Sequence, residues 1–293
     1  MILFRLFLLL DAVLMKLPSS WRKRLFTSLA ALVHRLAGKR NLIIRQNLDF
    51  AFQETLTSHE RAEIERYCYR NLGLNLLQVM ENRHATSEYF SKRIRFENRE
   101  KVDALLAEGR SMIFISAHFG NWEIGATALS LLVTPTTAIY KGFKRAEFDP
   151  YLLESRTRHR MNLAEKSGAL KHMARALKNG QSISLMIDQS SNPRDGVAVD
   201  FFGHPTYHSS TPAVLSYKYN APIVALYISS EDEENFVIRF EEPIEVQSDD
   251  KSSITEATQR QVATLEHIIR RSPKHWFWCH KRWKNEYNEI YAG

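Results

Sequence analysis

Residues 111–129, SMIFISAHFGNWEIGATAL, decide how this chain folds. The first part, residues 112–116, is a short apolar run that predicts a buried strand. The last part, residues 124–129, predicts a helix, and Gly120 between them permits a tight turn. A strand, a turn and a helix in immediate succession are typical of an α/β sheet.

Four further apolar runs have the length and composition of strands. They cover residues 136–140, 182–187, 222–228 and 236–240, and helical segments or long loops separate them. Because the interior runs are almost continuously apolar, we expect a central sheet covered by helices on both faces. From Asn47 to about residue 108 the pattern is helical, with Thr57 or Ser58 as the cap of a helix. We therefore predict one α/β domain over residues 21–293, with a helical N-terminal layer and a preceding helix at residues 1–20.

The composition excludes several classes of protein. The chain has 293 residues, 44% of them hydrophobic and 25% charged, with only 11 Gly and 9 Pro. These values exclude polytopic membrane proteins, collagen-like proteins and largely disordered chains. With Cys68 and Cys279 as the two cysteines, the chain has no disulfide framework or CxxC spacing, which fits a reducing compartment.

The first 17 residues, MILFRLFLLLDAVLMKL, predict a helix that lies on a membrane. Arg5, Asp11 and Lys16 interrupt the apolar residues, so no stretch approaches the roughly 20 residues that span a bilayer. No acidic residue lies between Asp11 and Asp49, although Lys and Arg are frequent there, and such charge suits lipid phosphates. Nucleic acid is a weaker alternative, because the apolar residues in this region repeat at helical spacing. An ordinary buried N-terminal helix is also possible.

His118 and Glu123 are the candidate catalytic pair. His118 directly follows the first strand, and Glu123 lies five residues later in the first turn of the next helix. A carboxylate in this position can fix the imidazole tautomer and make His118 a general base. The alternative is a capping histidine followed by a glutamate that the helix dipole favours. The sequence has no GxSxG, P-loop, GxGxxG or HExxH motif, so we expect no cofactor or metal. No activated Ser or Cys is evident, so we expect the substrate to attack directly, without a covalent enzyme intermediate.

The hexapeptide HFGNWE, residues 118–123, resembles the His-x4-acid signature of glycerolipid and lysophospholipid acyltransferases. Its His-x4-Glu form is similar to that of the late acyltransferases of lipid A biosynthesis, the lauroyl and myristoyl transferases. Further segments resemble that family's blocks in the same order. These are residues 45–52 (RQNLDFAF), 156–158 (RTR), 188–189 (DQ), 201–205 (FFGHP), 211–213 (TPA) and 273–284 (PKHWFWCHKRWK).

The resemblance implies transfer of a fatty acyl chain from an acyl-carrier-protein thioester to a hydroxyl of a lipid A precursor. It places such an enzyme at the cytoplasmic face of the bacterial inner membrane, with a membrane surface but no nucleic acid as partner. His118 would then take the hydroxyl proton, and Glu123 would support the imidazolium. Alternatives are acylation of a lysophospholipid or another glycolipid, from acyl carrier protein or coenzyme A, and a non-catalytic basic protein that binds membranes or nucleic acid.

The resemblance also implies a set of substrate-binding residues. Among them Arg156 would bind an anionic group of the acceptor; the alternative is that it belongs to a solvated helical face. Asp188 would hold an arginine in place; the alternative is an ordinary carboxylate at the end of a strand. At Arg160 the chain departs from the family, which is expected to have a small residue there. The implied substrate-binding residues are Asn121, Arg156, Arg158, Asp188 and Gln189.

Overall fold

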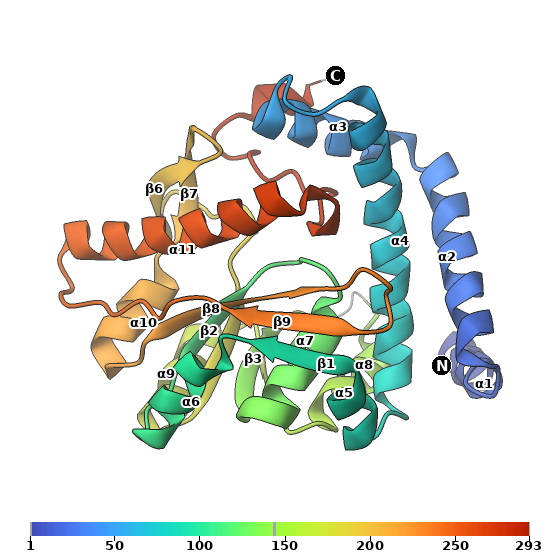
Figure 1. Ribbon diagram of the computed structural model, residues 1–293, viewed down its shortest axis with the longest axis horizontal. Helices are drawn as coiled ribbons and strands as arrows, with labels where there is room; N and C mark the ends of the chain where they lie inside the picture. The colour runs from blue at the N-terminus through green and yellow to red at the C-terminus, as the bar shows by residue number, and fades with distance from the viewer. Residues whose placement is uncertain (1, 143–144, 293) are drawn as a thin grey trace.

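A seven-stranded mixed sheet forms the centre of the protein, and helices flank it on both faces (Figure 1). The computed structural model describes residues 2–142 and 145–292. The strand order is β1-β9-β8-β2-β5-β3-β4. Strands β8, β2, β5, β3 and β4 are parallel, whereas β9 pairs with β8 in antiparallel fashion and β1 is parallel to β9. A separate antiparallel hairpin consists of β6 and β7.

The strands are short, and those in the middle of the sheet are almost fully buried. Their bounds are β1 Ile94–Glu97, β2 Ile113–Ser116, β3 Thr136–Tyr140, β4 Asn162–Glu165, β5 Ser182–Met186, β6 Gly196–Phe201, β7 His204–Ser209, β8 Ile223–Ser229 and β9 Phe236–Phe240.

Helices α1 to α4 precede the first strand in the chain, and α11 near the C-terminus is the longest of the later helices. The α-helices are α1 Ile2–Leu14, α2 Ser19–Leu36, α3 Gly38–Phe52, α4 Ser58–Asn82, α5 Ser87–Arg93, α6 Arg99–Ala107, α7 Trp122–Ala128, α8 Asp149–Thr157, α9 Ala169–Lys178, α10 Thr211–Tyr219 and α11 Lys251–Arg271. Short 3-10 or π segments are η1 Leu129–Val133, η2 Ala146–Phe148, η3 Pro273–His275 and η4 Asn288–Tyr291.

Two hydrophobic cores lie on opposite faces of the sheet. On one face, alternate residues of β2, β5 and β8 pack with α9, α10, α11 and the C-terminal segment. On the other face, the intervening residues of β2 and β8 pack with β9, α5, α6 and α7. The near-continuous apolar runs of the sequence are thus explained by burial on both faces.

The five predicted strands are present, but the sequence analysis missed four others. The prediction of a helical pattern as far as about residue 108 was wrong at one point, because β1 lies within that region and pairs with β9. Strand β4 was missed because it is a short edge strand with the mixed sequence NLAE. The hairpin of β6 and β7 lies outside the main sheet, and its strands expose several residues. Thr57 caps α4 as expected, in a capping box with Glu60.

Helices α1 and α2 lie beside α4 at one end of the molecule (Figure 1). Helix α1 packs one side against Met80 and Tyr151, while Leu6 and Leu9 are more than half exposed. Helix α2 similarly exposes Trp21 at its start. No helix within residues 2–142 and 145–292 combines the length and apolar character needed to cross a bilayer. Both helices therefore have an apolar surface that faces outward.

Candidate active site

His118 and Asp188 come together because β2 and β5 are neighbouring parallel strands. Ser116 and Met186 are register partners, and each functional residue lies two positions later. Asp188 Oδ1 is 3.0 Å from His118 Nδ1, and Asp188 Oδ2 accepts a hydrogen bond from the His118 backbone N–H at 3.0 Å. The carboxyl ends of parallel strands are where sites form in open α/β sheets.

The environment keeps Asp188 ionised. Burial of the carboxyl opposes ionisation, but the charge of His118 and hydrogen bonds from His118 and Trp276 lower its pKa to about 2. Trp276 Nε1 donates to Asp188 Oδ2 at 3.0 Å. Burial likewise opposes protonation of His118, yet the Asp188 carboxylate outweighs it and raises the His118 pKa above its ordinary value. Glu123 adds a smaller effect in the same direction.

The contact with Asp188 determines which nitrogen of His118 can act as a base. An ionised carboxylate accepts the Nδ1 proton, so the neutral ring carries its lone pair on Nε2. The ring is 22% exposed and lines a large cavity. Trp122 packs edge-on against it, with ring centroids 5.2 Å apart. His118 can therefore accept a proton from a hydroxyl that enters the cavity.

Glu123 binds Arg156 instead of the imidazole, which corrects the sequence analysis. Glu123 Oε1 is 2.6 Å from Arg156 Nη2, and Glu123 Oε2 is 3.1 Å from Arg156 Nε. This bidentate pair joins the first turn of α7 to the last turn of α8. Asp188 was expected to hold an arginine and Glu123 to orient the imidazole; the two carboxylates have the opposite contacts.

The loop between His118 and Glu123 is held by two buried asparagines of α4. Asn71 Nδ2 and Asn75 Nδ2 donate to the Gly120 carbonyl at 2.9 and 3.1 Å. Asn75 Oδ1 also accepts the backbone N–H of Glu123 at 3.2 Å. Both amides thus fix the backbone that presents His118 and Glu123, and no motif in the sequence indicated this role.

Gly120 is required by the geometry of this loop. Its φ is +57°, and a Cβ atom there would lie 2.1 Å from the Ile228 carbonyl oxygen. A residue with a side chain would be strained by the left-handed backbone and would collide with β8. Glycine therefore allows the loop to pass directly over β8.

The C-terminal segment forms the other side of the loop. Phe277 N donates to the His118 carbonyl at 2.9 Å, and Gly120 N donates to the His275 carbonyl at 2.9 Å. Trp276 is 3% exposed and Trp278 is fully buried, so this block belongs to the hydrophobic core. In addition, Trp276 contacts the Asp188 carboxylate directly, which the sequence did not indicate.

A cavity of about 1560 Å³ opens beside His118 and is lined mainly by apolar side chains. Its walls come from α1, α2, α4, α7 and α8 and from the sheet with α9. His118, Glu123 and Arg156 all line it. Pockets for drug-sized ligands typically measure about 300–1,000 Å³, so this space is larger than such a ligand needs.

The remaining predicted residues do not all reach this cavity. Gln189 lines it and is exposed. Asn121 caps α7 by accepting the Ile124 N–H, and it lines a different pocket. Arg158 is exposed at the end of α8 and does not line the cavity. Arg160 has a φ of +64°, a left-handed conformation that glycine adopts more readily than arginine.

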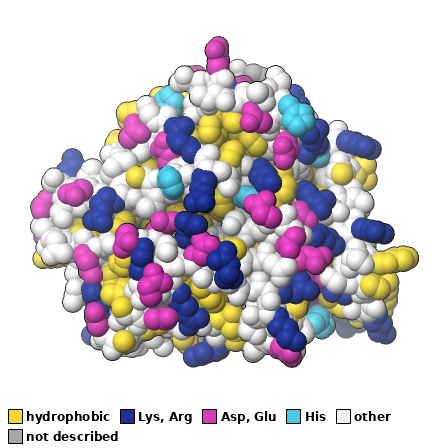
Figure 2. All heavy atoms as spheres, in the orientation of Figure 1, with side chains coloured by type: hydrophobic (Ala, Val, Ile, Leu, Met, Phe, Trp, Pro, Cys, Tyr) yellow, Lys and Arg dark blue, Asp and Glu magenta, His cyan; other side chains and the backbone are white. Residues whose placement is uncertain are grey.

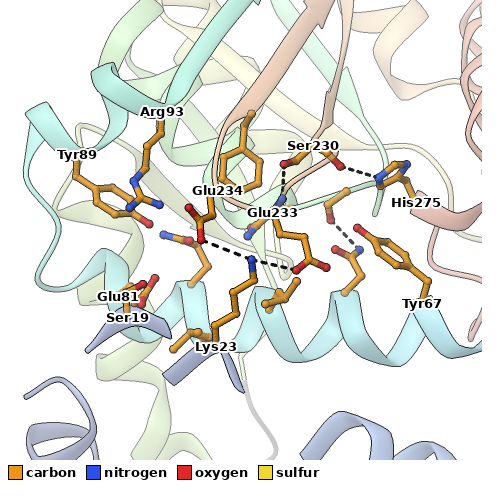
Figure 3. Close-up of a pocket in the computed structure, with 17 residues that line it drawn as sticks. Ser19, Lys23, Tyr67, Glu81, Tyr89, Arg93, Ser230, Glu233, Glu234 and His275 are labelled. Carbon is orange, nitrogen blue, oxygen red and sulfur yellow. Dashed lines mark hydrogen bonds and ion pairs between the residues drawn. The ribbon is translucent and has the colours of Figure 1, made fainter. Parts of the chain in front are cut away.

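A second pocket, of about 50 Å³, is lined by residues of α2 and α4 and by the loops that contain Gly120 and Glu233 (Figure 3). Lys23 crosses it and is 3.2 Å from Glu233, which also pairs with Arg70. Because this pocket is small and is crossed by ion pairs, it has no room for an acyl chain.

Comparisons with known proteins find one matching family and several relatives of low identity. The family described as "Bacterial lipid A biosynthesis acyltransferase" matches residues 2–285. The chain is 21% identical to the lipid A biosynthesis lauroyltransferase of Escherichia coli (strain K12), over 93% of this chain and 88% of that protein. It is 22% identical to lipid A biosynthesis acyltransferase 2 of Shigella flexneri, over 90% and 84%. It is also 23% identical to the phosphatidylinositol mannoside acyltransferase of Mycobacterium tuberculosis (strain ATCC 25618 / H37Rv), over 65% and 60%.

Proposed function

Because the chain belongs to the family of bacterial lipid A biosynthesis acyltransferases and is an acyltransferase, we propose that it acylates a lipid A precursor from an acyl-carrier-protein thioester. The observation that carries the proposal is His118, oriented by Asp188 at 3.0 Å, beside an apolar cavity of about 1560 Å³. Such a site combines a general base with space for acyl chains.

In the proposed reaction His118 acts as a general base. Its Nε2 takes the proton of an acceptor hydroxyl as the oxygen attacks the thioester carbonyl carbon. The tetrahedral intermediate then collapses, the C–S bond breaks, and the imidazolium returns the proton to the leaving thiolate. Asp188 stabilises the imidazolium throughout, because its carboxylate remains ionised.

Glu123 fixes the position of the Arg156 side chain. The ion pair fixes the guanidinium at the cavity wall, where it lies near enough to His118 to influence the His118 pKa. We propose that Arg156 binds a polar or charged group of the acceptor close to the reacting hydroxyl, and that Glu123 positions it. Glu123 is then a positioning residue for the arginine.

The cavity also supports binding of acyl chains from a membrane. Leu10, Leu25, Leu29 and Leu76 line it and are each more than a third exposed at the surface of α1, α2 and α4. The cavity is therefore continuous with an exposed apolar surface. Each methylene moved from water into this cavity is worth about 0.8 kcal/mol, so chain burial can contribute most of the binding energy.

The N-terminal helices are the proposed membrane-binding part of the protein. Figure 2 shows hydrophobic side chains with Lys and Arg beside them at the edge where α1 and α2 lie. Exposed Leu, Val and Trp residues next to exposed cations are typical of helices that lie in a membrane interface. We place this surface on the cytoplasmic face of the inner membrane, where acyl carrier protein is available. The net charge of +7 also favours an acidic carrier protein as donor.

A second acceptor class is supported by one comparison. The mycobacterial relative is described as an acyltransferase for phosphatidylinositol mannoside, which is a mannosylated phospholipid. A hydroxyl of another anionic glycolipid therefore remains the second candidate.

The acceptor is tested by offering purified protein one labelled acyl-carrier-protein thioester and three acceptors. These are a tetra-acylated lipid A precursor, a phosphatidylinositol mannoside and a lysophospholipid. Preferential acylation of the lipid A precursor supports the proposal. Preference for either of the other acceptors would contradict the proposed acceptor but not the proposed acyl-transfer reaction.

Membrane binding is tested by flotation with vesicles that contain anionic phospholipid. The double variant Leu6→Glu, Leu9→Glu replaces two exposed residues of α1, and we expect it to lose most vesicle binding. Val214→Glu, on the exposed side of α10, is the matched control. Equal binding by the double variant and the control would contradict the role of α1.

A further inference from the structure

The cavity has a second group of cations, apart from Arg156, at the ends of β3 and β4. Lys141 directly follows β3 and Lys166 directly follows β4, and both line the cavity. Arg145 lines it as well. Among the lining residues that the structure describes, Glu123 is the single carboxylate, and Arg156 already neutralises it. The cavity next to the reacting groups is therefore apolar in most of its lining but positively charged at this edge.

Lys141 and Lys166 are neighbours because of the strand register. Tyr140 and Glu165 are partners in the parallel pair of β3 and β4. The Lys166 backbone N–H continues the pairing by donating to the Tyr140 carbonyl at 2.8 Å. Adjacent strands are about 4.8 Å apart, so the two lysines leave the sheet side by side.

The charges around these lysines leave them available to a ligand. Within residues 2–142 and 145–292, neither lysine has a carboxylate oxygen within ion-pair distance. Arg145 is 3.9 Å from Glu147 and is thus partly neutralised. The Asp149 carboxylate lies near Gly142, the residue after Lys141. Two exposed ammonium groups at one edge of a cavity are suited to the oxygens of a phosphate.

We propose that Lys141 and Lys166 form a phosphate-binding site for a substrate of the acyl transfer, an inference that rests on the proposed function. Strands β5 and β3 separate β4 from β2, so the site is roughly 10–15 Å from β2, the strand that precedes His118. It therefore takes a phosphate several bonds away from the reacting atoms. Two substrates have such a group: the sugar phosphate of the acceptor and the phosphopantetheine arm of the donor.

The test compares matched substrates that differ only in one phosphate. The donor pair is acyl-phosphopantetheine and acyl-pantetheine, and the acceptor pair is the phosphorylated precursor and its dephosphorylated form. For each pair, kcat/KM is measured with wild type, Lys141→Gln/Lys166→Gln, Lys141→Arg/Lys166→Arg and Lys178→Gln. Lys178 is exposed on α9 and does not line the cavity, so its variant controls for loss of charge.

We expect the double glutamine variant to lower the preference for the phosphate-bearing member of one pair by about tenfold. The pair that responds identifies the source of the phosphate. The arginine variant should retain the preference to within about threefold, and the Lys178 variant should match wild type. An unchanged preference in both pairs, or an equal loss in the Lys178 variant, would overturn the proposal.

A binding measurement separates failure of this inference from failure of the proposed function. Dodecyl phosphate and dodecanol are titrated into wild type and the double glutamine variant in the same detergent. If the double glutamine variant binds dodecyl phosphate more weakly than wild type but binds dodecanol equally well, the site is supported. This holds even if wild type acylates none of the acceptors. Equal affinity of both proteins for dodecyl phosphate would contradict it.

Discussion

Replacement of Asp188 by asparagine should reverse the tautomer of His118. Asp188 Oδ2 accepts two N–H groups, from the His118 backbone and from Trp276, whereas Oδ1 faces His118 Nδ1. An asparagine amide satisfies the two donors when its oxygen takes the Oδ2 position. Its NH₂ group then faces Nδ1 and donates to it, so the ring proton moves to Nε2. The nitrogen in the cavity is then protonated and cannot act as a base.

The size of the effect follows from the pKa of Asp188. Its lowering from 3.8 to about 2 corresponds to about 2–3 kcal/mol of preference for the ionised carboxylate, since a tenfold change in the acid constant is about 1.4 kcal/mol. Asparagine retains the hydrogen bonds from Trp276 and the His118 backbone, so loss of the charge alone would slow proton transfer by at most roughly 60-fold. The wrong tautomer adds to this loss. We therefore expect Asp188→Asn to lower kcat by at least about 100-fold.

The assay is steady-state acyl transfer to the preferred acceptor with saturating donor. Asp195→Asn, a substitution at an exposed loop carboxylate, is the control and should retain wild-type activity. Circular dichroism and the melting temperature verify that Asp188→Asn is folded. A folded variant with kcat within threefold of wild type would refute the assignment of Asp188 as the partner of His118.

Three further predictions concern the same site. The raised pKa of His118 means that the base is protonated at low pH, so kcat/KM should rise with pH through a pKa above about 6.5; a midpoint below 6 would contradict the contact with Asp188. Glu123→Gln removes the charge that holds Arg156, so we expect KM for the acceptor to rise about tenfold or more. The midpoint of the acid limb of the pH profile should move only slightly to lower pH. A larger effect on that midpoint than on KM would assign Glu123 to the imidazole. Gly120→Ala should lower the melting temperature by roughly 5–10 °C because of positive φ and the contact with Ile228, and an unchanged melting temperature would contradict the geometry of the loop.

The sequence predicted the elements whose signals are local. Thr57 and Glu60 have the spacing of a capping box, and the five apolar runs have the composition of buried strands. The position of His118 directly after a strand followed from the same local pattern. These features depend on residues within one turn or one strand, so no tertiary information was needed.

The partners of the site residues could not be predicted in the same way. Asp188 reaches His118 because β5 is next to β2, although β3 and β4 separate them in the chain. Glu123 and Arg156 meet only when α7 and α8 are packed at the same cavity. Contacts of this kind depend on strand order and helix packing, which apolar periodicity does not specify.

The most direct test of the account is acyl transfer to the lipid A precursor by His118→Ala and wild type under identical conditions. If Nε2 of His118 is the general base, kcat should fall by about 10²–10⁴-fold in a variant that remains folded and still binds donor and acceptor. A folded His118→Ala protein that transfers the acyl chain at a rate within tenfold of wild type would contradict the mechanism.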